Sequence, residues 1–302
     1  MMRRVMQRTA AASSSTSSSC RLLWRRCLGG GVGGGDSADV LCEKSSDGLF
    51  ATITINRPQV HNALSPSVIE GLHEHFDALQ KDCGGPKGLR AVFVRAAGKT
   101  FCAGGDLKHM RETGNFDFEQ NKAEAMQLSG VFARIRDFPR PVVGLVNGPA
   151  YGGGVGVISC FDVAFCTKSA IFALSEVTLG VIPATISPFV IAKIGENAAS
   201  RYFLTAERFG SDEAVAIGLI NDIVEDSEGL DEKETALRKA FGRCSPEALA
   251  STKTLIRGVA NRPIDTELRE YTAARLAEVR ESHDGKEGMT AFLEKRKPEW
   301  LV

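Results

Sequence analysis

The sequence has no long hydrophobic run and few residues of the kinds that bind metals. No stretch of about 18 consecutive apolar residues occurs in its 302 residues, so it predicts no transmembrane helix and no membrane partner. It has five histidines, and its eight cysteines include no CxxC pair. These spacings support neither a disulfide framework nor a zinc site, and we expect no metal.

Acidic residues are absent from the first 35 positions. This segment has six arginines and no lysine, and it is rich in serine, threonine and alanine. That composition is typical of an organelle transit peptide, so residues 1–35 are expected to direct the protein to the mitochondrial matrix. A disordered basic tail is the alternative interpretation. The glycines of GGGVGGG at the end of the segment indicate a flexible link.

Without this segment the chain is acidic. Removing the six arginines from the 37 basic residues leaves 31 against 37 acidic residues, a net charge of about −6. Because a negative surface repels phosphate backbones, we expect no nucleic-acid partner.

The spacing of apolar residues predicts an α/β protein. Residues 49–56 (LFATITIN) alternate as in a strand, and residues 67–83 have helical spacing after a Ser65-Pro66 start. Further strands are expected at 89–96, 141–148, 162–167 and 170–176, a long helix at 118–138, and almost only helices from Pro183 onward. We therefore expect a layered core over residues 36–230, built from repeated strand–turn–helix units, and a helical part over residues 231–302.

Two glycine-rich turns carry the main functional signal. CAGGDL at 102–107 and YGGGVGV at 151–157 each lie between an expected strand and an expected helix. Neither matches the GxGxxG dinucleotide fingerprint or the P-loop. Glycine lets a ligand approach the backbone, and N–H groups at a helix start are unpaired. Two such groups aimed at one point would stabilise a carbonyl oxygen as it becomes negative. Tight packing against a sheet is the alternative.

Six blocks of sequence resemble the enoyl-CoA hydratase/isomerase, or crotonase, family. They are INRP with NAL, FCAGGDLKHM, RPVVGLVNGPAYGGGVGV, FALSEVTLGVIPA, AIGLI and EGMTAFLEKRKPEW, in order over about residues 48 to 300. The resemblance implies a crotonase-like spiral of ββα units. It also implies a C-terminal part that forms homotrimers or hexamers, and an acyl-CoA thioester as the bound partner.

The resemblance also implies the site residues. Backbone N–H groups of Gly105 and Gly153 would form the thioester oxyanion hole, and Glu176 would be the acid/base group. No separate cofactor is expected, because coenzyme A is part of the substrate. The other substrate-binding positions implied are Arg57, Ala103, Asp106, Leu107, Lys108, Gly152, Phe292 and Lys295.

One expected carboxylate is missing. Hydratases of the family commonly use two glutamates, but the position two residues after GGG is Gly156. Three consequences are open: a hydratase whose water is placed by another group, a Δ3,Δ2-enoyl-CoA isomerase with Glu176 as its sole acid/base, or a non-catalytic acyl-CoA-binding member. Candidate auxiliary groups are Glu112, Glu124 and Asp106.

A further block bears on the substrate. Many members have a glycine-rich turn after IP, whereas this chain has IPATISPFVI. Together with GGGVGV, this most resembles the 3-methylglutaconyl-CoA and carboxygeranoyl-CoA hydratase group. The resemblance implies addition of water across a 2-enoyl-CoA whose acyl chain carries a second carboxylate.

Overall fold

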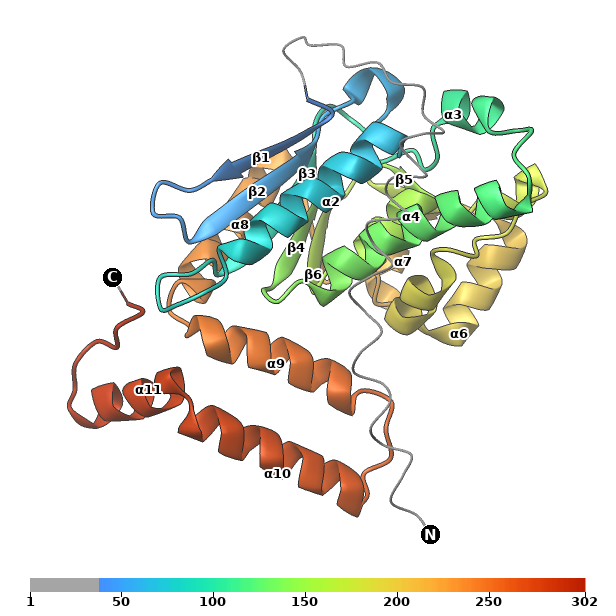
Figure 1. The fold of residues 1–302 in the computed structure, drawn as a ribbon. Helices are drawn as coiled ribbons and strands as arrows, with labels where there is room; N and C mark the ends of the chain where they lie inside the picture. Colours follow the sequence, from blue (N-terminus) through green and yellow to red (C-terminus); the bar gives the residue numbers. More distant parts are fainter. Residues whose placement is uncertain (1–37, 302) are drawn as a thin grey trace.

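The structure is a computed structural model that describes residues 38–301 (Figure 1). The expected transit segment, residues 1–35, lies outside the described residues.

A six-stranded sheet with the order β1-β2-β3-β4-β6-β9 forms the centre of the fold. Strand β1 is antiparallel to β2, and every other neighbouring pair is parallel. Parallel strands bring their carboxyl ends to one edge, and both glycine-rich turns follow strands of this sheet. The strands are β1 (Val40–Lys44), β2 (Phe50–Ile55), β3 (Ala91–Ala96), β4 (Val142–Val146), β6 (Val163–Thr167) and β9 (Asp222–Val224).

A smaller three-stranded sheet has the order β5-β7-β8. It consists of β5 (Ala150–Tyr151), β7 (Ile171–Ala173) and β8 (Phe209–Gly210). As expected, the described residues after Pro183 form almost only helices, and the exceptions are two short strands, β8 and β9. Both are too short to show alternation, and they are held by pairing with β7 and β6.

Helices cover both faces of the main sheet (Figure 1). Successive side chains of β3 point to opposite faces of the sheet. Val92 and Val94 pack on one face in a large apolar cluster that includes residues of α2 (Pro66–Lys81) and α4 (Phe118–Asp137). The intervening Phe93 packs in a second cluster with Leu230 of α8 (Ser227–Phe241). Because α8 begins before residue 231 and lies on the sheet, the expected division at 230/231 falls inside a sheet-covering helix.

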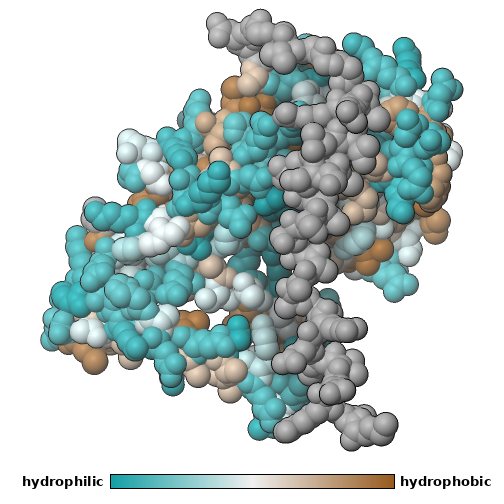
Figure 2. All heavy atoms as spheres, viewed as in Figure 1, coloured by the Kyte–Doolittle hydropathy of each residue, from teal (hydrophilic) through white to brown (hydrophobic). Residues whose placement is uncertain are grey.

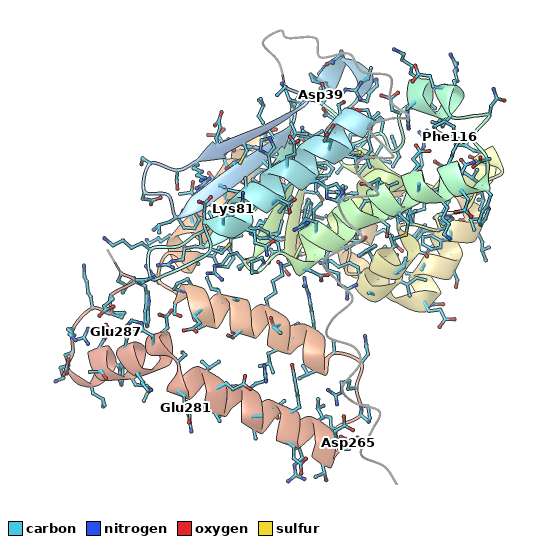
Figure 3. The ribbon with its side chains drawn as sticks, in the orientation of Figure 1. Asp39, Lys81, Phe116, Asp265, Glu281 and Glu287 are labelled. Atoms are coloured by element: carbon cyan, nitrogen blue, oxygen red, sulfur yellow. The ribbon has the colours of Figure 1, made fainter. Side chains whose placement is uncertain are left out.

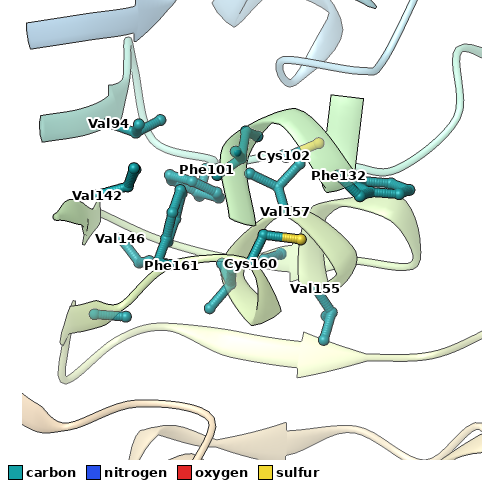
Figure 4. Close-up of a cluster of buried hydrophobic side chains, with 14 of the residues drawn as sticks. Val94, Phe101, Cys102, Phe132, Val142, Val146, Val155, Val157, Cys160 and Phe161 are labelled. Atoms are coloured by element: carbon teal, nitrogen blue, oxygen red, sulfur yellow. The ribbon is translucent and has the colours of Figure 1, made fainter. Parts of the chain in front are cut away.

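The core beneath the glycine turns is closely packed (Figure 4). The rings of Phe101 and Phe161 meet edge to face, with centroids 6.3 Å apart. On β4, a Cβ atom at Gly144 would lie 2.1 Å from Cδ2 of Phe161. This contact requires glycine and brings α5 (Gly153–Ser159) close to the sheet.

The remaining elements before the C-terminal helices lie around the glycine turns and the smaller sheet. They are α3 (Leu107–Glu112), α6 (Ser187–Thr205), α7 (Ser211–Ala216) and the 3₁₀ turns η1 (Pro58–Val60) and η2 (Glu176–Leu179).

Three C-terminal helices, α9 (Pro246–Val259), α10 (Thr266–Glu281) and α11 (His283–Leu293), lie together at one end. Asp265 and Glu281 mark the limits of α10 in Figure 3. In the space-filling view, hydrophobic residues interrupt the mostly hydrophilic surface of this end (Figure 2). Across residues 38–301, no helix combines the length and apolar character required to cross a membrane.

Candidate active site

The two glycine-rich turns lie side by side. Cys102 and Ala150 form a parallel bridge, and the N–H of Tyr151 donates to the carbonyl of Cys102 at 2.9 Å. A Cβ atom at Gly104 would lie only 3.8 Å from the backbone nitrogen of Gly153. Gly104 also has φ = +89°, a conformation that favours glycine. The pairing therefore brings the two turns together at the edge of the sheet.

Two backbone N–H groups are left over at this junction. Leu64 bonds to both neighbours of Gly105, donating to Gly104 O at 2.7 Å and accepting from Asp106 N at 3.4 Å. In a parallel bridge this pattern turns the N–H of Gly105 away from Leu64. The first N–H used within α5 belongs to Gly156, so the N–H of Gly153, at the positive end of that helix, has no hydrogen-bond partner among residues 38–301. These are the donors that an oxyanion hole requires.

Glu176 lies against the second turn. It begins η2 shortly after the end of β7, and the N–H of Gly152 donates to the carbonyl of Ala173 in β7 at 2.9 Å. A Cβ atom at Gly152 would lie 3.0 Å from Oε1 of Glu176. Gly152 also has φ = +48°. Glycine at 152 thus serves both the turn and the close approach of the carboxyl group.

The environment of Glu176 favours its neutral form. Its Oε2 atom is buried and has no hydrogen-bond partner among the described residues. Burial raises the pKa of the Glu176 carboxyl above its ordinary value of 4.5, and only its own backbone N–H opposes that effect. A carboxyl group with a raised pKa holds its proton more readily than an exposed one, which suits it to proton transfer in catalysis.

A cavity of about 340 Å³ contains both the turns and Glu176. Apolar side chains of Leu64, Ile69, Leu128 and Ile186 form much of its wall. Of the positions expected to bind substrate, the cavity is lined by Ala103, Asp106, Leu107 and Gly152, together with Gly105 and Gly153.

Arg57 and Asp106 form an ion pair at the start of α3. Arg57 Nη1 donates to Asp106 Oδ2 at 2.8 Å and to the carbonyl of Ala63 at 3.2 Å. The other oxygen of Asp106 caps α3 by accepting from the N–H groups of Lys108 and His109. The structure therefore places Arg57 as a partner of Asp106, outside the lining of the cavity.

Besides Arg57, three expected substrate-binding residues are not brought to this cavity within the chain. The side chain of Lys108 points into solvent, 3.9 Å from Glu112. Phe292 is 78% exposed on α11, and Lys295 follows that helix. The expectation that Phe292 and Lys295 reach the site of a neighbouring subunit stays a prediction.

The position of the missing glutamate is closed by a neighbouring side chain. A Cβ atom at Gly156 would lie 2.4 Å from Cγ2 of Ile186 and 3.2 Å from Cζ of Phe132. Ile186, at the start of α6, is one of the residues that line the cavity. Gly156 is therefore a packing position here as well as the site of an absent carboxylate.

Sequence reasoning missed one functional group of the cavity. His109 and Glu124 both line it, and His109 Nε2 lies 2.5 Å from Glu124 Oε1. Glu124 had been one of several auxiliary candidates, without a partner. The available signal was the place of His109 in the first turn of the helix that follows GGD, where a side chain projects back over the turn.

Within residues 38–301, no group of three or more His, Cys, Asp or Glu side chains is arranged to hold a metal ion. The groups available for chemistry in the cavity are two main-chain donors, the buried carboxyl group of Glu176 and the His109–Glu124 pair, within largely apolar walls. This combination defines a site that can stabilise a thioester enolate and move a proton beside it.

Comparisons with known proteins place the chain in a family. Residues 46–301 match the model of the enoyl-CoA hydratase/isomerase family. A putative enoyl-CoA hydratase of Thermus thermophilus is 34% identical over 251 residues, covering 83% of this chain and 97% of that protein. A short-chain-enoyl-CoA hydratase of Clostridium acetobutylicum is 30% identical, covering 86% and 97%. The chain belongs to the enoyl-CoA hydratase/isomerase family.

The fold agrees with this assignment. The crystal structure of an enoyl-CoA hydratase from Shewanella pealeana superimposes with a TM-score of 0.81 at 36% identity, covering 87% of this chain and 96% of that one. The expected crotonase-like fold is confirmed.

Proposed function

We propose that this protein is an enoyl-CoA hydratase that adds water across the double bond of a short 2-enoyl-CoA thioester. The observation that carries the proposal is the unpartnered, buried carboxyl group of Glu176 beside the free N–H groups of Gly105 and Gly153. The names of the similar bacterial proteins support it.

The geometry suggests how the residues act. The thioester oxygen accepts from the N–H groups of Gly105 and Gly153, which stabilise negative charge as the double bond becomes an enolate. Protonated Glu176 donates to the α-carbon while water adds to the β-carbon. Apolar walls exclude bulk water, so these hydrogen bonds act in a medium of low polarity.

The acyl group we propose is of the 3-methylglutaconyl-CoA type, with a second carboxylate. The segment IPATISPFVI and the GGGVGV turn support this choice through their resemblance to that group of hydratases. The modest cavity volume, about 340 Å³, suits a short acyl chain.

Isomerisation is the second candidate, and Gly156 favours it. A Δ3,Δ2-enoyl-CoA isomerase needs one base to move a proton between two carbons, and Ile186 closes the position of a second carboxylate. Turnover of crotonyl-CoA, 3-methylglutaconyl-CoA and a 3-enoyl-CoA separates the two. Hydration is followed by mass spectrometry as the gain of a water, and isomerisation, which leaves the mass unchanged, by the ultraviolet absorbance of the conjugated 2-enoyl thioester. Hydration of 3-methylglutaconyl-CoA at the highest kcat/KM supports the proposal. Conversion of only the 3-enoyl-CoA would establish the isomerase, and turnover of none would leave an acyl-CoA-binding role.

The proposed location is the mitochondrial matrix, on the composition of residues 1–35. A reporter fused to residues 1–40 should enter mitochondria, and a cytosolic reporter would refute the assignment.

A further inference from the structure

Hydration requires a group that positions and deprotonates water, and the usual one is absent. Residue 156 is glycine, and the space beside it is filled by Ile186. Glu176 serves the α-carbon, so the water at the β-carbon needs a second base. Among the described residues that line the cavity, the other carboxyl and imidazole side chains are those of Asp106, His109 and Glu124.

Asp106 is already engaged. One of its oxygens is paired with Arg57 and the other accepts two N–H groups of α3. These bonds lower the pKa of the Asp106 carboxyl despite the cost of burial, so it is a weak base.

His109 and Glu124 form an oriented pair. They come from α3 and α4, and their side chains are 12% and 27% exposed. When Nε2 carries the proton, it donates to Glu124 Oε1 at 2.5 Å, which leaves Nδ1 as an acceptor. No hydrogen bond to Nδ1 is found among the described residues. A carboxylate that fixes the tautomer of an imidazole and supports its positive charge is the arrangement that makes histidine a general base.

We propose that His109, oriented by Glu124, holds and deprotonates the water that adds to the β-carbon. In this step the water oxygen bonds to the β-carbon, and a water proton passes to His109 Nδ1. The π electrons of the double bond move to the thioester oxygen, and the enolate then takes the proton of Glu176 at its α-carbon. Solvent returns a proton from His109 to Glu176. The inference rests on the proposed hydratase function.

The competing role for His109 is recognition of a second carboxylate on the substrate by its protonated ring. That role would affect KM for 3-methylglutaconyl-CoA and leave crotonyl-CoA unaffected, because crotonyl-CoA has no second carboxylate. The two roles therefore differ in which substrate and which kinetic constant respond.

The test uses a reaction that needs Glu176 but no added water. In D₂O, removal of the α-proton of butyryl-CoA by Glu176 and its return as deuterium can be followed by mass spectrometry. His109→Gln should lower kcat for hydration of both enoyl-CoA substrates by about 10²–10⁴-fold while α-deuterium exchange continues at the native rate. Retained exchange also shows that the variant is folded.

Glu124→Gln tests the positioning role of its carboxylate. It should lower kcat less than His109→Gln, with KM near native, and Glu124→Asp should recover part of the loss. Arg111→Gln on α3 and Glu119→Gln on α4 are matched controls, because both side chains are exposed outside the cavity lining. Both should hydrate at the native rate.

Three outcomes would overturn the inference. They are native hydration by His109→Gln, a loss confined to 3-methylglutaconyl-CoA, and a parallel loss of hydration and exchange. If the native enzyme hydrates none of the substrates, the proposed hydratase function itself fails. Measuring turnover by the native enzyme therefore separates failure of the proposed function from failure of the role proposed for His109.

Discussion

Glu176 is the residue whose surroundings most favour proton transfer. Its Oε2 atom is buried and lacks a hydrogen-bond partner within the described residues, and apolar side chains form much of the wall of the cavity that it lines. Burial, and not a charged partner, is what raises the pKa of the Glu176 carboxyl. Two predictions follow from this environment.

Glu176→Gln keeps the shape of the side chain and removes proton transfer. We expect kcat on the best enoyl-CoA to fall by about 10²–10⁴-fold, with little change in affinity for the CoA product. Steady-state kinetics and calorimetry measure the two effects. Near-native turnover by this variant would exclude Glu176 as the acid/base group.

Glu176 should also make stability depend on pH. Because burial raises its pKa in the folded protein, its contribution is complete below the unfolded value near 4.5. The contribution is lost as pH rises through the folded pKa. Glutamine cannot ionise, so Glu176→Gln should gain stability relative to the native protein across that window. Thermal unfolding from about pH 4 to 8 measures it. A difference in Tm that does not change with pH would contradict the expectation.

At the scale of elements, α5 and α6 close the place where a second carboxylate would stand. Gly156→Ala should destabilise the fold by about 1–3 kcal/mol, because the new methyl group meets Ile186 in a packed wall. Gly156→Glu should therefore fail to increase crotonyl-CoA hydration. Adding Ile186→Ala to Gly156→Ala should recover part of the loss, measured by urea unfolding. Equal free energies of unfolding for Gly156→Ala and the native protein would show that Ile186 moves to accommodate the methyl group.

Local sequence patterns were sufficient to predict the longer helices and strands. Alternation in residues 50–55 and the Ser65 cap placed β2 and α2 to within a few residues. Strand β9 could not be found this way, because three residues show no period and its position is decided by pairing with β6. Tertiary pairing outweighs local preference for such short segments.

The candidate site also has parts that the sequence predicts and parts that it does not. The glycine turns and Glu176 lie in sequence blocks that could be recognised, and the structure brings them into one cavity. The contact of His109 with Glu124 crosses between two helices joined by an irregular loop, so no spacing rule gives it. The filling of the Gly156 position by Ile186 is likewise a contact between distant segments.

At the scale of the whole molecule, the C-terminal part exposes large apolar side chains. Ile264, in the loop between α9 and α10, is 88% exposed, and Phe292 and Leu293 on α11 are 78% and 74% exposed. Exposed apolar patches are typical of association surfaces. They support the proposal of a homotrimer or hexamer.

Light scattering at micromolar concentration should therefore give three or six times the mass of the chain. Ile264→Ser with Leu293→Ser should shift the protein towards smaller species, because both replace apolar contacts with hydroxyl groups that must be desolvated. Lys297→Ser, a polar change near the same end, is the control. A monomer for the native protein would refute the assembly.

The pairing of Cys102 with Ala150 has a consequence for how this enzyme can change. The two donors of the proposed oxyanion hole are main-chain N–H groups, so no substitution removes them without disturbing the turns themselves. Side chains of the cavity wall come from other segments, including α4 and the residues before α6. New acyl groups can therefore be accommodated by exchanging wall residues while enolate stabilisation is inherited unchanged. In this proposal the main chain determines the type of reaction, and the residues of the cavity wall determine which acyl group is bound.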